Sequence, residues 1–261
     1  MFLDRNEIPQ YFCRNLLIPP HEIRGVDMVS ASSRRGTEHL FFSGMALLLV
    51  GEMLLGFWHS YIGAGLVRAT LPSLLVHLHA ALFVGWIILF AVQTLLVARG
   101  RVAVHRRLGS VMGWWAAAMV LVGPATVIMA LRRPTSGVDA TVLAGDFAQT
   151  IAFVLLIARG LARRHHAPEH KRLMTLASAS IIGPALARWP FAIMHAEPPI
   201  GIPLFYLLPP LLLLLYDLAT LHRVHRATWF GVVLMVLVVV SFVALPAIPA
   251  WQGFAHWAQH V

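Results

Sequence analysis

Seven stretches of this chain are apolar and long enough to cross a bilayer as helices, at about 20 residues each. We expect these spans at 39–58, 74–98, 108–130, 144–162, 173–195, 203–221 and 229–248. Helices are expected because hydrocarbon cannot satisfy free backbone amides and carbonyls. Hydrophobic residues make up 59% of the 261 residues and charged residues only 12%, which a water-soluble fold could not bury. The predicted fold is therefore an all-α integral membrane domain over residues 38–248.

Two polar segments flank this domain. Residues 1–37 carry nine charged side chains and no apolar signal-peptide core, so we expect a disordered segment there. Translation could also start at Met28, which opens a basic stretch just before the first span. Residues 249–261 are expected to form a short tail. The only cysteine, Cys13, excludes an intramolecular disulfide and a cysteine-based zinc site.

The distribution of basic residues predicts the orientation of the spans. Sixteen of the 20 lysine and arginine residues lie in four segments that alternate with the other loops. Those segments are 1–38, 99–107, 159–172 and 222–228. The opposite loops hold only Arg68, Arg132 and Arg133. By the positive-inside rule the N-terminus is expected in the cytoplasm and the C-terminus outside. The net charge of +9 then faces lipid headgroups, and no domain outside the membrane remains for nucleic acid.

A short sequence element occurs twice along the chain. LLVARGRVAVHRRLG covers residues 95–109, and LLIARGLARRHHAPEHKRLM covers residues 155–174. Each copy has an apolar run, then Ala-Arg-Gly, then a histidine with a basic pair and a leucine. Both copies join consecutive spans on the side predicted to be cytoplasmic. The repeat predicts two similar hairpins, spans two and three and spans four and five, packed as a four-helix core.

The histidine in each copy has two interpretations. In the first, the arginines and lysine of both copies, Arg172 included, hold the hairpin ends in the cytoplasm, and the histidines are ordinary interfacial residues. In the second, His105 and His170 begin corresponding helices and approach each other, as the axial ligands of a haem do. A separation of more than about 15 Å would exclude a shared haem, because both imidazoles must reach one iron.

Ionisable and amide side chains inside the spans are candidates for a functional site, because they are costly in lipid. The second span carries His79 and Gln93 on one stripe that we expect to face the bundle. In the half predicted to be external, four spans contribute polar residues, and these are Glu52, His79, Asp146, Gln149, Arg188 and His195. The guanidinium of Arg188 stays charged and needs an anion, for which Glu52 and Asp146 are available. The cluster is either a structural ion pair or a small hydrophilic pocket for a substrate, a quinone headgroup or a proton.

The motifs at VHLHAALFVGWIILFAVQTLLVARGRVAVHRRLG (76–109) and EHKRLMTLASASIIGPALARWP (169–190) carry a resemblance. Here the chain resembles a group of bacterial multi-pass membrane proteins that share HRxLG and H(K/R)RLM elements. The resemblance covers about residues 73–225 and implies a bacterial inner-membrane location without an established activity. More loosely, the chain is similar to b-type di-haem membrane cytochromes. It departs from them because His105 and His170 lie at span ends.

Three functional hypotheses follow, and the favoured one is a non-catalytic scaffold or assembly factor for another membrane complex. The second is a transporter or small-molecule binder that uses the external polar residues. The third is a haem-b-binding electron-transfer protein, with His105 and His170 at an inner haem and His79 and His195 at an outer one. An enzyme is disfavoured because no nucleotide, zinc-protease or serine-hydrolase motif occurs. The expected partners are the lipid bilayer and, for a scaffold, another membrane protein.

Overall fold

The computed structural model describes residues 20–196 and 200–260. The chain falls into two units, residues 1–42 and 43–261, and the second contains the helical bundle. Six helical stretches of the described residues are long and apolar enough to cross a membrane. They are Gly36–Ile62, Leu74–Ala98, Val102–Leu131, Ala140–Ala162, Gly201–Leu221 and Arg226–Ala244. The described residues contain no strand, so the all-α membrane fold is confirmed.

These stretches lie in the helices that follow, the first of them with the π-helical turn Trp58–Ile62 added at its end. In chain order they are α2 (Pro20–Phe57), α3 (Leu74–Ala98), α4 (Val102–Leu131), α5 (Ala140–Ala162), α8 (Gly201–Tyr206) with α9 (Leu208–Leu221), and α10 (Arg226–Ala244). Local chemistry fixes several helix starts. The Asp139 carboxylate accepts hydrogen bonds from the backbone N–H groups of Thr141 and Val142 at the start of α5. Gly100, with φ of +71°, makes the tight turn between α3 and α4.

The helix expected over residues 173–195 is broken. Helix α6 (Ala167–Ser180) ends at Ser180, and only the single turn α7 (Gly183–Leu186) and the 3₁₀ turn Ala192–Met194 follow. Pro184 has no N–H, so it cannot donate to the carbonyl four residues earlier, which is that of Ser180. The hydroxyl of Tyr206 donates to this carbonyl instead, at 2.9 Å. The prolines therefore end this helix rather than kinking it, and a hydrogen bond from α8 stabilises the break.

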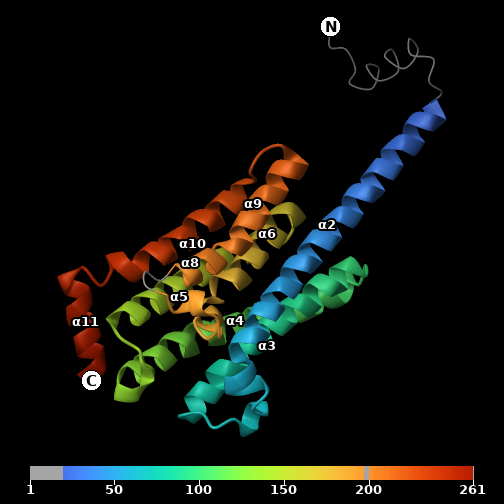
Figure 1. Cartoon of the computed structure of the whole chain (residues 1–261). Helices are drawn as coiled ribbons and strands as arrows, with labels where there is room; N and C mark the ends of the chain where they lie inside the picture. Colours follow the sequence, from blue (N-terminus) through green and yellow to red (C-terminus); the bar gives the residue numbers. More distant parts are fainter. Residues whose placement is uncertain (1–19, 197–199, 261) are drawn as a thin grey trace. The chain divides into compact units, whose positions relative to one another are not determined.

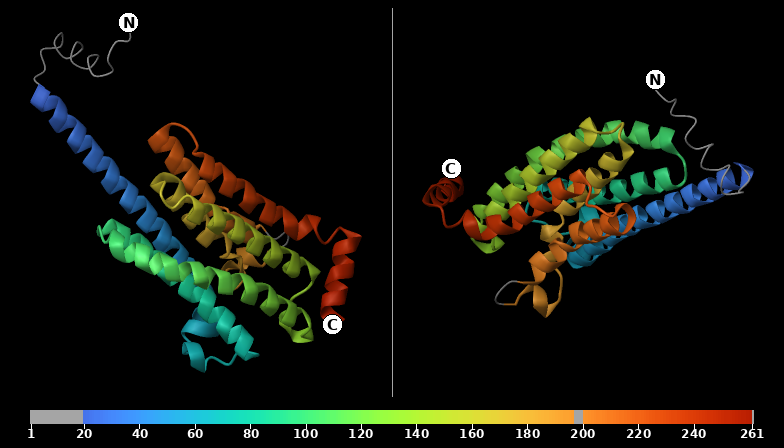
Figure 2. Two further views of the ribbon diagram at one scale, coloured as in Figure 1. Left: turned by 180° about the vertical axis from the view of Figure 1, so that it is seen from behind. Right: turned by 90° about the horizontal axis from the view of Figure 1, so that it is seen from above.

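The two predicted hairpins pack together as a four-helix core. Helix α3 packs on α4 and α5 packs on α6, while α4 also contacts α5 and α3 contacts α6. Helix α10 lies along α5 and α6, as Figures 1 and 2 show. Two glycines permit this close packing, because a side chain at Gly145 or Gly231 would collide with Phe242 or Leu176. The turns after α3, α5 and α9 lie at one end of the bundle, which we call the basic end.

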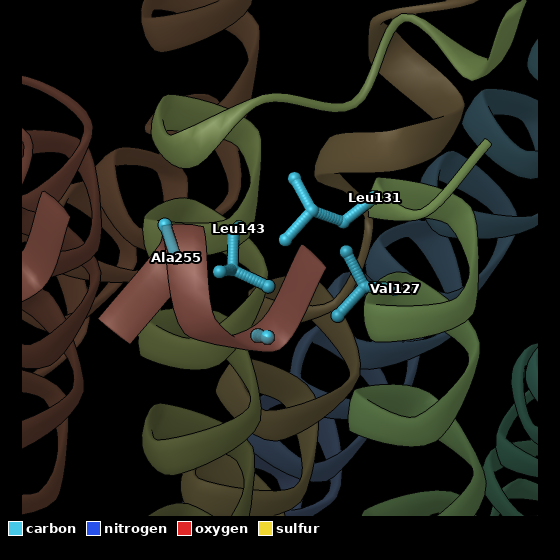
Figure 3. Packing of buried hydrophobic residues seen from close by; sticks show 5 residues of the cluster. Val127, Leu131, Leu143 and Ala255 are labelled. Carbon is cyan, nitrogen blue, oxygen red and sulfur yellow. The ribbon is translucent and has the colours of Figure 1, made fainter. Parts of the chain in front are cut away.

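Both segments predicted to flank the membrane domain contain helix. The expected tail is largely helix α11 (Pro249–His260), which packs against α4 and α5. Figure 3 shows buried residues that join α11 to those helices, namely Val127, Leu131, Leu143 and Ala255. Ala258 of α11 belongs to the same cluster. At the other terminus, α2 runs from Pro20 through the boundary expected at residue 37. Disorder was predicted over residues 1–37, and of these, residues 1–19 lie outside the described residues.

The hydrogen bond across the helix break can be tested directly. We expect Tyr206→Phe to lower the free energy of unfolding by about 1–3 kcal/mol, because the buried Ser180 carbonyl loses its donor. Pro184→Ala restores an N–H opposite that carbonyl, so Tyr206→Phe should cost less in a Pro184→Ala background. Thermal unfolding of the four proteins in detergent measures this coupling. Equal costs in both backgrounds would show that the tyrosine hydroxyl does not replace the missing helix bond.

Candidate functional site

The segment that follows the break of α6 lies against both α2 and α5. A Cβ atom at Gly56 would lie 2.3 Å from the backbone oxygen of Ala185, so α2 and α7 are in backbone contact there. On α5, the Gln149 side-chain oxygen would lie 2.5 Å from a Cβ atom at Gly183. The indole N–H of Trp189 donates to the backbone oxygen of Glu52 at 3.1 Å. The broken segment therefore brings polar groups of two spans to one place.

Glu52 is the most isolated polar group at this place. The residue is 2% exposed, and neither carboxyl oxygen has a hydrogen-bond partner among the residues that the structure describes. The side-chain oxygen of Gln149 and Nδ1 of His79 are also buried without a partner in this part of the chain. The Gln149 amide nitrogen makes only long bonds, at 3.4 Å, to the Gly145 carbonyl and the Asp146 carboxylate. Several polar atoms beside the broken segment are thus unsatisfied.

Arg188 lies on the protein surface beside this group. Its side chain donates a hydrogen bond to the backbone carbonyl of Pro184 at 2.6 Å. This carbonyl has no donor from the helix because α7 ends at Leu186. The guanidinium lies 5.1 Å from the centre of the Phe57 ring, a cation–π contact. It interacts electrostatically with Asp146 and His79. Among the described residues it forms no ion pair within 4 Å, and Asp146, one of its two expected partners, interacts with it electrostatically at longer range.

We call Glu52, His79, Asp146, Gln149 and Arg188 the polar cluster. The cluster runs from Glu52 and Gln149, which are buried, through His79 and Asp146, which are half-buried, to the exposed Arg188. His79 stacks on Phe83 with ring centres 4.2 Å apart. The cluster combines unpaired acceptors on Glu52 and Gln149 with one cation, Arg188, that interacts electrostatically with His79 and Asp146.

The predicted outer haem pair is not assembled. His195 is exposed, and its Nε2 lies 3.1 Å from the Trp189 carbonyl. No contact joins His195 to His79 in the described parts of the chain. Both histidines lie in the half predicted to be external, but the helix expected to carry His195 ends at Ser180.

The two histidines of the repeated element do meet, at the basic end. The ring centres of His105 and His170 lie 6.3 Å apart, with an angle of 83° between the planes. Nδ1 of His170 lies 2.8 Å from the Gly160 carbonyl. Gln93, a predicted binding residue, donates from its amide to the backbone oxygen of His105 at 3.2 Å. It thereby ties the end of α3 to the first turn of α4.

A buried ion pair at the basic end was missed in the sequence. Arg172 and Asp217, 2% and 0% exposed, form it between α6 and α9. Arg172 donates to one carboxylate oxygen of Asp217 from Nε and Nη2, at 2.9 and 2.5 Å, and from Nη1 to the Pro168 carbonyl. The other oxygen accepts from the Thr228 hydroxyl and the His225 backbone N–H. The pair is fully hydrogen-bonded, which is typical of a structural element.

Arg172, which was expected to help set the topology, thus also has a buried partner in the bundle. Asp217 lies within the apolar run LLLLLYDLATL, and an acid in such a run needs a cation at the same depth. Its position alone therefore predicts a basic partner. Burial, together with the charge of Arg172, lowers the pKa of the His225 side chain. The neutral imidazole accepts a hydrogen bond from the Ala227 N–H at 3.1 Å and caps α10.

No protein-family model matches the chain, and neither a curated protein nor a solved structure is significantly similar to it. Two arrangements are not explained by packing alone, namely the polar cluster and the pair formed by His105 and His170.

Proposed function

We propose that this chain is a membrane protein that binds a small polar molecule at the polar cluster. The observation that carries this proposal is the carboxyl group of Glu52, which is buried and has no hydrogen-bond partner among the described residues. An unsatisfied buried polar group costs about 1–3 kcal/mol, and more if it is charged. A structural role does not account for this cost, whereas a ligand that supplies the missing partner does.

The unpaired atoms indicate the chemistry of the ligand. Both oxygens of Glu52 and the side-chain oxygen of Gln149 are acceptors, and Nδ1 of His79 is a further unpaired atom that can donate or accept. A matching ligand therefore presents hydrogen-bond donors, such as hydroxyl or amino groups. Arg188 supplies a cation at the exposed edge of the same cluster, so an acidic group on the ligand can lie there.

The location of the cluster in the membrane is part of the proposal. We place the protein in the bacterial inner membrane with the basic end in the cytoplasm, as the distribution of Arg and Lys favours. His79 is near the start of α3, and the basic end is at the other end of that helix. The polar cluster would then take its ligand from the external side or from the outer leaflet.

A scaffold for another membrane complex is the main competing function, and it needs none of these side chains. A transporter would need the same cluster, together with a movement that exposes it to the other side. Binding is common to the transporter and the simple binder, so binding is the property to test first.

Replacing Glu52 separates binding from packing. We expect Glu52→Met, which keeps the length of the side chain but removes its polar atoms, to raise the thermal unfolding midpoint by a few degrees. The reason is that a non-polar group of similar size removes an unsatisfied cost of about 1–3 kcal/mol. Native mass spectrometry of the same preparation should show a bound small molecule on the wild type and none on the variant.

Ser178→Ala is the matched control, since Ser178 is buried but satisfied. It accepts a hydrogen bond from the Trp86 indole at 3.1 Å, so its removal should lower the midpoint. If Glu52→Met lowers the midpoint as Ser178→Ala does, Glu52 is a structural residue. If in addition no preparation carries a small molecule, the binding function is rejected and the scaffold is favoured.

A further inference from the structure

We propose that His105 and His170 are the two axial ligands of an iron porphyrin at the basic end. This site goes beyond the proposed function, because it uses other residues at the opposite end of α3. The inference depends on four observations, which are the separation of the rings, the orientation of His170, the absence of a third ligand and the charge of the surrounding loops.

The separation of the two rings is suited to a shared metal. A bond between a metal and an imidazole nitrogen is about 2.0–2.1 Å long, and the ring centre lies roughly 1.1 Å behind the nitrogen. Two imidazoles on opposite sides of one metal therefore have ring centres about 6 Å apart. The observed distance between His105 and His170 is 6.3 Å. This distance is well below the separation of about 15 Å beyond which a shared haem is excluded.

His170 is oriented as a metal ligand is. A carbonyl can only accept, so the contact of 2.8 Å with the Gly160 oxygen places the proton of the neutral ring on Nδ1. Nε2 then carries a free lone pair. Histidines that bind metals usually donate their other nitrogen to a carbonyl or carboxylate in this way. In the other ring, Nδ1 of His105 is buried without a partner among the described residues.

The number of ligands favours a porphyrin over a bare metal ion. No group of three or more His, Cys, Asp or Glu side chains in the described residues could hold a metal ion. Structural zinc needs four ligands, and two imidazoles leave it incomplete. An iron porphyrin brings four equatorial nitrogens of its own and needs two axial ligands from the protein.

The charge at this end fits the two carboxylates that a haem carries. Arg106 and Arg107 follow His105 directly and are exposed, and Arg106 interacts electrostatically with it. Arg164 is exposed in the turn that leads to His170, and the neighbouring Arg163 is exposed but already paired with Glu169 at 3.2 Å. Guanidinium groups bind carboxylates with paired hydrogen bonds, so propionates that emerge at this end meet suitable partners.

The test is a titration of the purified full-length protein, in mild detergent, with haemin. We expect one haemin per chain and the visible spectrum of low-spin iron with two nitrogen ligands. His105→Ala and His170→Ala should each weaken binding at least tenfold and abolish the low-spin spectrum. His165→Ala is the matched control, because His165 is exposed in the same turn, and it should bind as the wild type does.

Variants that fail to fold are identified by size-exclusion chromatography, and His170→Met then serves in place of His170→Ala. Methionine can still ligate iron, so this variant should retain haemin with an altered spectrum and a higher reduction potential. The proposal is overturned if haemin gives no low-spin spectrum with the wild type. It is equally overturned if both alanine variants keep that spectrum, or if His165→Ala loses it to the same extent.

Discussion

Asp217→Ala is expected to lower the free energy of unfolding by about 3–5 kcal/mol, the largest effect of any substitution considered for this chain. The variant leaves the guanidinium of Arg172 buried and charged without its anion, and it removes the acceptor of the Thr228 hydroxyl. Thermal unfolding in detergent should show a midpoint lower by about 10 °C or more, or loss of the folded protein.

Two comparisons show whether burial is the cause. Arg163 and Glu169 form a partly exposed ion pair at 3.2 Å, and Arg163→Ala should cost no more than about 1 kcal/mol. The double variant Arg172→Met with Asp217→Leu replaces both buried charges by apolar groups, so it should be more stable than Asp217→Ala. A double variant that is no more stable than Asp217→Ala would contradict this account.

Gly56→Ala is expected to have the second largest effect, a loss of about 1–3 kcal/mol together with loss of the polar cluster. The new Cβ would lie 2.3 Å from the backbone oxygen of Ala185, and a backbone atom cannot move aside as a side chain can. The broken segment must then move away from α2, which separates Glu52 from Trp189. Thermal unfolding and native mass spectrometry report the two consequences separately.

Gly51 provides the control on the same helix. A Cβ at Gly51 meets nothing within 4 Å, so Gly51→Ala should leave stability unchanged or raise it by up to about 1 kcal/mol through helix propensity. If Gly56→Ala behaves like Gly51→Ala, the contact between α2 and α7 is not needed for the fold or for the cluster.

The spans could be predicted because hydropathy is a local property of the chain. In lipid an isolated span must satisfy its backbone hydrogen bonds within itself, which only a helix does. An apolar run of sufficient length therefore predicts a helix. The span expected at 74–98 has the bounds of α3, and six of the seven expected spans are found. The repeated histidine element also predicted correctly that two hairpins form the core, since short turns make consecutive spans neighbours.

The break after Ser180 could not be predicted from the prolines alone. A proline in a membrane helix is tolerated when neighbouring groups satisfy the freed carbonyl within a continuous helix. Here the satisfying group is Tyr206, which lies 26 residues away and belongs to another helix. Whether a proline kinks or ends a helix therefore depends on a donor that only the folded chain supplies.

The sequence by itself determined six of the segments that can cross a membrane, because apolar length is a property of each segment without reference to its neighbours. It also determined that each polar side chain in these segments needs a partner. Only the tertiary structure decided the partners. In the folded chain Asp217 pairs with Arg172, 45 residues away in the sequence, and His105 lies beside His170. The carboxyl group of Glu52 has no partner among the described residues. The physical reason is that hydrogen bonds and ion pairs act over a few ångströms and depend on direction, whereas burial depends on composition alone.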